Sequence, residues 1–190
     1  MRIIAGSAKG KKLNSPEDER VRPTSDRARE GLFSSLESAY GSLTELYFLD
    51  LFAGSGAVGV EALSRGAEIV HAVEDEVSEL TSSNFALVNN ASGKYKVFKN
   101  RAKRFLESDA ALKYDIIFMD PPYDISNEEI TELLDIIKER NLIQARGIVT
   151  IERRSKNAPF AWPVGMECEK VRSYGQGSIF YGGYSASVLP

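Results

Sequence analysis

The sequence predicts an α/β protein with a mostly parallel seven-stranded sheet, helices on both faces and a C-terminal antiparallel hairpin. Three observations indicate this class. From about residue 46, short apolar runs alternate with segments of helical periodicity, short glycine-containing turns join them, and no helix separates the last two strands. With 190 residues, 43% hydrophobic and 27% charged, the chain has the length and composition of a globular protein with one substantial core.

An N-terminal extension is expected before the main domain. Residues 1–22 are predicted to form a small β-hairpin followed by a polar loop. The main domain, residues 23–190, should begin with an amphipathic helix that is capped by Thr24 or Ser25 and ends near Tyr40.

The main domain is then expected to alternate between strands and helices. The predicted strands cover 47–51, 69–73, 95–98, 114–119 and 147–151, with a closing antiparallel pair at 167–173 and 178–184. The predicted helices cover 58–65, 77–90 and the region around 130–137, with a short one ending near 105. The carboxyl ends of such strands are where ligands bind in open α/β sheets.

A glycine-rich turn, Asp50-Leu-Phe-Ala-Gly-Ser-Gly-Ala-Val-Gly59, follows the first predicted strand. Glycines let a ligand approach the main chain, and Glu74, at the end of the next strand, is placed to accept hydrogen bonds from a ribose. This pattern serves either a dinucleotide or S-adenosylmethionine. Asp50 favours the latter, because its charge would repel a pyrophosphate and attract the ammonium group of a methionine. The alternative is a tight turn that binds no ligand. Under that interpretation, the three glycines and the two acids would occur together only by coincidence.

The fourth predicted strand ends in Asp120-Pro121-Pro122-Tyr123. An exocyclic amino group on a base is a poor nucleophile, since its lone pair is delocalised into the ring. A carboxylate at Asp120 and the carbonyl of Pro121 could accept its N–H hydrogens and localise that lone pair, while Tyr123 stacks on the base. Asp120 could also help to remove the proton. A strand-ending turn without chemistry could carry the same residues.

Charge is uneven along the chain, although its net value is only −3 and its pI is about 5.4. A basic N-terminal segment could contact RNA phosphates, and it contains Arg2, Lys9, Lys11, Lys12, Arg22, Arg27 and Arg29. A second basic cluster contains Arg153, Arg154 and Lys156. One cysteine and one histidine predict neither an internal disulfide nor a metal site, and the absence of a signal-like segment predicts a cytoplasmic protein.

Leu49 to Gly56 resembles the first motif of class I methyltransferases, and the pair of motifs resembles those of amino-group methyltransferases. The segments 2–6, 9–13, 22–30 and 32–33 are similar to the N-terminal signature of the RsmD family of bacterial 16S ribosomal RNA guanine-N2 methyltransferases. The resemblance implies a class I (Rossmann-like) fold, S-adenosylmethionine as cofactor, and a guanine N2 substrate of the position-966 type in the small ribosomal subunit or its assembly intermediate.

The resemblance also implies site residues. The catalytic residues would be Asp120, Pro121 and Tyr123. The cofactor would contact Asp50, Phe52, Ala53, Gly54, Gly56, Glu74, Asn100, Arg101, Ala102 and Asp120. Two positions depart from the family pattern. Glu76 stands where an Asp is common two residues after Glu74. Arg101 stands where relatives carry an acid or an amide before the alanine, so Asn100 or the main chain is expected to recognise the adenine.

Other functions remain open at this point. An adenine-N6 nucleic-acid methyltransferase would use the same tetrapeptide. A dinucleotide-binding oxidoreductase fits the glycine turn but gives Asp120 to Tyr123 no role, and a non-catalytic ribosome-assembly factor explains neither motif. Nothing in the sequence demands more than a monomer.

Overall fold

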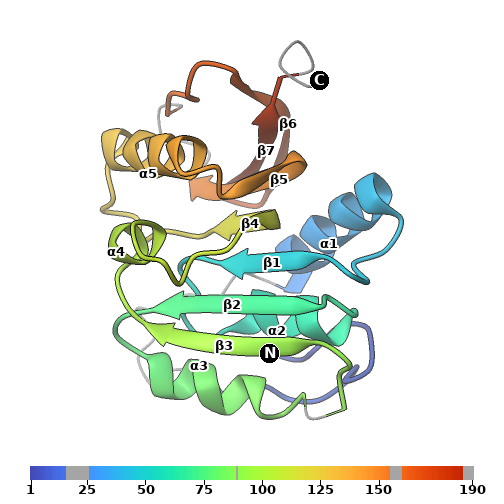
Figure 1. The fold of residues 1–190 in the computed structure, drawn as a ribbon. Coiled ribbons are helices and arrows are strands. Elements are labelled where there is room, and N and C mark those ends of the chain that lie inside the picture. The colour runs from blue at the N-terminus through green and yellow to red at the C-terminus, as the bar shows by residue number, and fades with distance from the viewer. Residues whose placement is uncertain (16–25, 89, 155–159, 186–190) are drawn as a thin grey trace. The chain divides into compact units, whose positions relative to one another are not determined.

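The computed structural model describes residues 1–15, 26–88, 90–154 and 160–185. The chain forms two compact units, Met1–Arg101 and Ala102–Pro190 (Figure 1). The domain boundary expected near residue 22 and the expected caps Thr24 and Ser25 fall outside the described residues. Within the described ranges, none of the helices has the length and apolar character needed to cross a membrane.

The first unit contains three parallel strands and three helices. Its elements are α1 (Asp26–Tyr40), β1 (Tyr47–Asp50), α2 (Ala57–Ser64), β2 (Ile69–Glu74), α3 (Ser78–Phe85) and β3 (Lys94–Lys99). The strand order is β3-β2-β1, and both pairings are parallel. Helix α2 contacts β1 and β2, and α3 contacts β2 and β3, as expected for helices that connect neighbouring parallel strands.

Apolar periodicity explains how α1 joins this unit. The helix buries one face, made of Ala28, Leu32, Phe33 and Leu36 together with the aliphatic part of Arg29. The ring of Phe33 stacks on that of Phe48 in β1, with 6.2 Å between centroids. Gly41, with φ of 77°, follows the last helical residue, and this left-handed conformation ends the helix where the sequence predicts.

The second unit contains four strands and two helices. Its elements are α4 (Ala102–Leu106), β4 (Tyr114–Met119), α5 (Asn127–Glu139), β5 (Ile143–Arg154), β6 (Met166–Tyr174) and β7 (Gly177–Tyr184). The strand order is β4-β5-β7-β6, with β4 and β5 parallel and β7 antiparallel to both its neighbours. The two units thus hold the seven strands and the closing hairpin that the sequence predicts.

Helix α5 begins at a capping box. The Ser126 hydroxyl accepts the N–H of Glu129 at 3.1 Å, and the Glu129 carboxylate accepts the N–H of Ser126 at 2.9 Å. Two otherwise unsatisfied N–H groups are paired in this way. The cap fixes the start of α5 at Asn127, seven residues after Asp120, and so limits the conformations of the segment that follows β4.

The prediction that a helix runs from 77 to 90 is wrong at its end, because α3 stops at Phe85. Its second half is rich in serine, threonine and asparagine, which favour local hydrogen bonds over helix continuation. The amides of Leu87 and Val88 donate to carbonyls three residues back, those of Asn84 and Phe85, which tightens the chain out of the α-helix.

Strand β5 starts four residues before the expected position. Pairing with β4 shifts register between Tyr114 and Ile116, so that Tyr114 lies opposite Ile143 whereas Ile116 lies opposite Ile148. The segment 144–146 contains the polar residues Gln144 and Arg146, so the sequence has no apolar run there that would predict a strand.

The N-terminal hairpin is confirmed in minimal form. Arg2 and Lys12 form an antiparallel bridge, the Ile3 N–H donates to the Lys11 carbonyl at 3.0 Å, and the Gly10 N–H donates to the Ile3 carbonyl at 2.9 Å. The side chains of Ile3, Ala8 and Leu13 are buried, so the hairpin packs on the rest of its unit.

Candidate active site

The glycine-rich turn connects β1 to α2 in the first unit. The Ala53 N–H donates to the Val73 carbonyl at 2.9 Å, and the Gly56 N–H donates to the Ala53 carbonyl at 2.7 Å. Gly56 precedes α2 with φ of 78°, a left-handed conformation that a residue with a Cβ adopts only at a cost. The turn is therefore shaped by main-chain hydrogen bonds, with Phe52 half-buried beside it.

Helix α3 holds the turn from one side. The Thr81 hydroxyl donates to the Gly54 carbonyl at 2.7 Å, and the Asn84 amide donates to the Ser55 carbonyl at 2.8 Å. Both side chains are fully buried. Two consecutive carbonyls of the turn are thus satisfied by protein, which fixes the orientation of the peptide groups between them.

Asp50 lies at the carboxyl end of β1, and it is 1% exposed. Its Oδ2 accepts the N–H of Gly59, in the first turn of α2, at 2.9 Å. The positive end of the helix dipole and this hydrogen bond both stabilise the carboxylate. An ionised carboxylate has several acceptor positions, so the contact with α2 is compatible with a further contact to a cationic ligand.

Gly59, the third glycine of the motif, allows α2 and α3 to approach closely. A Cβ at this position would lie 2.7 Å from Cζ of Phe85 and 3.2 Å from Oδ2 of Asp50. The residue therefore serves packing rather than direct approach to a ligand.

Gly59→Ala is expected to destabilise the protein by about 1–2 kcal/mol, because overpacking of about 1–3 kcal/mol outweighs a helix-propensity gain of up to about 1 kcal/mol. Urea unfolding of the variant measures the change. Ser34→Ala, at an exposed position of α1, is the matched control and should leave stability unchanged or slightly raised. Equal unfolding midpoints for both variants would contradict the packing role.

Glu74 closes the turn from the end of β2. Its Oε2 accepts the Gly54 N–H at 2.7 Å, and its Oε1 accepts the N–H groups of Glu76 and Val77 at 2.9 and 3.2 Å. The carboxylate is half-buried. It braces the cofactor turn directly, a role that the sequence pattern does not reveal, and any ribose hydroxyl would share an acceptor that already binds main chain.

The residues expected to recognise the adenine begin just after β3. The side-chain carbonyl oxygen of Asn100 accepts the N–H of Arg101 at 3.0 Å. Helix α4 begins at Ala102. The side chain of Arg101 is 86% exposed, and its Nε lies 3.8 Å from Oδ2 of Asp75. Arg101 thus extends into solvent beside an acidic neighbour, and its main chain rather than its guanidinium is suited to a ligand contact.

In the second unit, the tetrapeptide stands where the sequence predicts, directly after β4. Asp120 is half-buried, Pro121 is buried and Tyr123 is 54% exposed. The Ile125 N–H donates to the Pro122 carbonyl at 3.2 Å, which makes the segment a turn. A rigid turn that presents a carboxylate and an exposed ring is suited to holding a planar, hydrogen-bonding ligand.

Two arginines at the end of β5 support this turn, and the sequence pattern indicates them only as a basic cluster. Arg153 is buried, and its Nη2 donates to the Ile125 carbonyl at 2.8 Å. Burial lowers the pKa of Arg153 from its ordinary value. The Arg154 guanidinium lies over the Tyr123 ring, 3.8 Å from its centroid, in a cation–π contact. Lys156, the third basic residue of the cluster, lies outside the described residues.

The basic N-terminal residues divide into four groups, the last of which is the buried Arg29. Arg2, Lys9, Lys12 and Arg27 are exposed, as contact with RNA requires. The ammonium of Lys11 donates to the Leu87 carbonyl at 2.7 Å and is partly buried. Arg22 lies outside the described residues.

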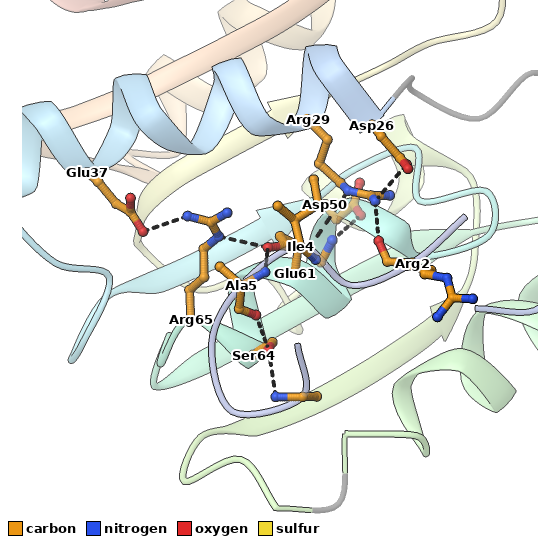
Figure 2. A network of polar contacts seen from close by, with 12 residues as sticks. Arg2, Ile4, Ala5, Asp26, Arg29, Glu37, Asp50, Glu61, Ser64 and Arg65 are labelled. Carbon is orange, nitrogen blue, oxygen red and sulfur yellow. Dashed lines mark hydrogen bonds and ion pairs between the residues drawn. The ribbon is translucent and has the colours of Figure 1, made fainter. Parts of the chain in front are cut away.

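The expectation that Arg29 contacts RNA is wrong for this structure, since its side chain is completely buried. Figure 2 shows its polar contacts. Its Nη2 donates to the Arg2 carbonyl and to Asp26 Oδ1, and its Nε lies 3.9 Å from Oε2 of Glu61. Burial lowers the pKa of Arg29 despite the opposing effect of Glu61 and Asp26. The sequence places Arg29 at a helical position adjacent to the buried Ala28, which is the signal that could have indicated burial.

Glu61 is the centre of this buried network, and sequence reasoning did not single it out. It is the one acidic residue of α2, whose residues are all buried, and its Oε1 accepts Nε of Arg65 at 2.8 Å. Arg65 in turn donates to Glu37 at 2.7 Å. An acid within an otherwise apolar helix is the sequence signal for such a buried ion pair.

Residues 1–182 match the family model described as conserved hypothetical protein 95. The ribosomal RNA small subunit methyltransferase D of Escherichia coli strain K12 is 30% identical over 93% of this chain and 86% of its own length. The protein of the same name from Haemophilus influenzae is 32% identical over 86% of this chain and 83% of its own length.

Solved structures agree in fold. The structure of the Escherichia coli protein yhhF, described as a candidate methyltransferase, has a TM-score of 0.82, 27% identity and coverage of 98% of both chains. That of HI0767 from Haemophilus influenzae has a TM-score of 0.75 and 29% identity, and covers 95% of this chain and 96% of its own. The fold is that of the S-adenosylmethionine-dependent methyltransferases. The chain belongs to the family that this model describes, the RsmD family.

Proposed function

We propose that the protein transfers a methyl group from S-adenosylmethionine to the exocyclic N2 of a guanine in 16S ribosomal RNA, of the position-966 type. The observation that carries the proposal is the turn after β4, which presents a half-buried Asp120 and an exposed Tyr123 whose ring lies under the Arg154 guanidinium. The names of the relatives, both small-subunit ribosomal RNA methyltransferases, support the substrate class.

The chemistry needs two acceptors and a stacking surface. Asp120 and the Pro121 carbonyl would bind the two N2 hydrogens and direct the nitrogen lone pair at the donor methyl group. A C–N bond forms as the S–CH3 bond breaks, S-adenosylhomocysteine leaves, and the excess proton passes from N2 to Asp120 or to water. The target base would first leave its stack, at a cost of a few kcal/mol, and Tyr123 would offer replacement stacking.

The donor side would be built by the turn in the first unit. The Asp50 carboxyl group, which accepts the N–H of Gly59 in α2, would attract the ammonium group of the methionine moiety. Glu74 would share its acceptor oxygens with the ribose hydroxyls. Phe52 to Gly56 would line the donor, and the main chain at Asn100 to Ala102 would meet the adenine.

The exposed basic residues of the N-terminal segment (Arg2, Lys9, Lys12 and Arg27) would bind phosphates of the RNA. The substrate would be the small subunit or its assembly intermediate, which places the reaction in the cytoplasm, and a monomer is sufficient for it.

Nucleoside analysis of 16S ribosomal RNA from a deletion strain tests the proposal. Loss of one N2-methylguanosine, restored by a plasmid copy, is expected. An unchanged N2-methylguanosine content together with loss of N6-methyladenosine would favour the adenine enzyme instead. Calorimetry distinguishes the oxidoreductase, because that reading requires the protein to bind NAD in preference to S-adenosylhomocysteine.

Arg154→Ala is expected to raise the KM for RNA about two- to fivefold, with kcat and cofactor affinity kept, because an exposed cation–π contact contributes about 0.5–1 kcal/mol. Steady-state kinetics with isolated small subunits measures this. Arg172→Ala, which removes an exposed arginine of β6, is the matched control and should leave KM unchanged. A KM change of equal size in both variants would show a general charge effect and remove the specific role of Arg154.

A further inference from the structure

The N-terminal hairpin is docked onto α2 through a buried carboxylate. The N–H groups of Ile4 and Ala5 donate to Glu61 Oε2 and Oε1 at 2.7 and 2.9 Å (Figure 2). Glu61 is itself completely buried and is held from the other side by Arg29 and Arg65. Two main-chain amides of the hairpin thus depend on one buried acid.

A second set of contacts fixes the hairpin at the end of α2. The Ser64 hydroxyl donates to the Ala5 carbonyl at 2.6 Å and accepts the Ala8 N–H at 3.0 Å, while the Ser64 carbonyl accepts the Ser7 N–H at 2.7 Å. Gly6 packs against this point so closely that a Cβ would lie 1.8 Å from the Ser64 carbonyl oxygen. The hairpin therefore fits α2 in one position, with no room for even a methyl group.

The side chain of Asn84 connects the chain that leaves the hairpin with the cofactor turn. Asn84 accepts the N–H of Asn14 at 2.8 Å and donates to the Asn14 carbonyl at 3.0 Å. The same amide nitrogen donates to the Ser55 carbonyl in the glycine-rich turn at 2.8 Å. Asn84 is fully buried, so water cannot replace either partner without a rearrangement.

We infer that the docked hairpin is a positioning element of the methyl-donor site, acting through Asn84 on the glycine-rich turn. This inference rests on the proposed use of S-adenosylmethionine, but not on the identity of the methylated base. When the hairpin is docked, Asn14 orients the Asn84 amide, and Asn84 together with Thr81 orients the Ser55 and Gly54 peptide groups. When it is undocked, Asn84 loses two of its three partners and the turn loses its support.

The inference has a consequence for substrate binding. If RNA that binds the basic hairpin stabilises the docked state, it raises affinity for the donor, and by linkage the donor raises affinity for RNA by the same factor. The extension would then connect recognition of the substrate with readiness of the cofactor site, rather than act as an independent tether.

Calorimetric titration with S-adenosylhomocysteine tests the inference in the full-length protein. Gly6→Ala should undock the hairpin and weaken binding about tenfold, equivalent to about 1.4 kcal/mol. The matched control is Gly10→Ala in the same hairpin, where φ is +85° but a Cβ has no atom within 4 Å. The control has the same left-handed strain without the clash, and should bind within about twofold of wild type.

A milder substitution provides a second test in case Gly6→Ala does not fold. Ser64→Ala removes both side-chain hydrogen bonds to the hairpin, leaves the main chain of α2 intact, and should weaken binding about threefold through partial undocking. If circular dichroism shows that Gly6→Ala is not folded, Ser64→Ala alone decides. In kinetics, either folded variant should raise the KM for S-adenosylmethionine while kcat at saturating donor is kept, which a general loss of stability would not produce.

The possible results distinguish failure of this inference from failure of the proposed function. A loss of affinity beyond that of Gly10→Ala in a folded variant supports the inference. Folded undocking variants that bind S-adenosylhomocysteine like the control overturn it. Failure of the wild-type protein to bind S-adenosylhomocysteine at all would instead overturn the proposed function.

Discussion

Asp120→Ala is expected to lower kcat for methyl transfer by about a hundredfold or more, while affinity for S-adenosylhomocysteine stays within about twofold of wild type. The reason is chemical. Without the carboxylate, the amino group loses the acceptor that localises its lone pair and one route for its proton, whereas the glycine-rich turn and Glu74 are untouched. Transfer of a labelled methyl group to small subunits isolated from a deletion strain measures kcat, and calorimetry measures cofactor affinity.

Asp124→Ala is the matched control, because Asp124 is an exposed acid in the same turn. It should keep near-normal turnover, which would show that removal of a nearby charge is not enough. An Asp120→Ala enzyme with near-normal turnover would contradict the role of Asp120 as hydrogen-bond acceptor.

The buried strands β1, β2 and β4 could be predicted because burial on both faces of the sheet gives them short apolar runs. The β4 segment is apolar except for Asp115, and a proline pair follows Asp120 directly, so the sequence predicts both the position and the end of this strand. The predicted helix runs past the end of α3 at Phe85, and the hydrogen-bond partners of Asn84 in the last turn of α3, Asn14 and Ser55, are distant in sequence. Periodicity carries no information about such partners.

The candidate ligand-binding residues stand out in the sequence for a different reason. Asp50 and Glu74 end β1 and β2, Asp120 follows β4, and ligands bind at the carboxyl ends of strands in open α/β sheets. The sequence shows that Gly59 belongs to a glycine motif. It does not predict the close approach of Gly59 to Phe85, because the distance between helices depends on tertiary packing.

Charged residues were the least predictable group. Arg27 and Arg29 are two positions apart on α1, yet one is exposed and the other completely buried against Glu61. A rotation of about 200° around the helix separates the two side chains. The basic residues that were predicted to form one surface therefore lie partly in solvent and partly in the core. Arg154 shows the converse: a residue interpreted as one of a solvated cluster contacts the aromatic ring of the tetrapeptide.

The buried ion pair between Arg29 and Glu61 is sensitive to the loss of either partner. The carboxylate of Glu61 compensates Arg29, accepts Nε of Arg65, and satisfies the amides of Ile4 and Ala5. Arg29 is completely buried and Ile4, Ala5 and Arg65 are partly buried, so bulk water can replace the acid only in part. Stability of the first unit should therefore depend on Glu61 far more than on any exposed acid.

Glu61→Ala is accordingly expected to lower the free energy of unfolding by about 4 kcal/mol, since breaking a buried ion pair costs about 3–5 kcal/mol and unsatisfied amides add to this. That is a large part of the about 5–15 kcal/mol by which folded proteins are stable. Urea unfolding followed by circular dichroism measures the change. Glu37→Ala is the matched control: it also removes a partner of Arg65, but 41% of the Glu37 side chain is exposed, and the expected loss is about 0.5–1 kcal/mol. If both variants lose the same small amount, the buried carboxylate does not organise the hairpin and α1, because its removal would then leave no uncompensated charge in the core.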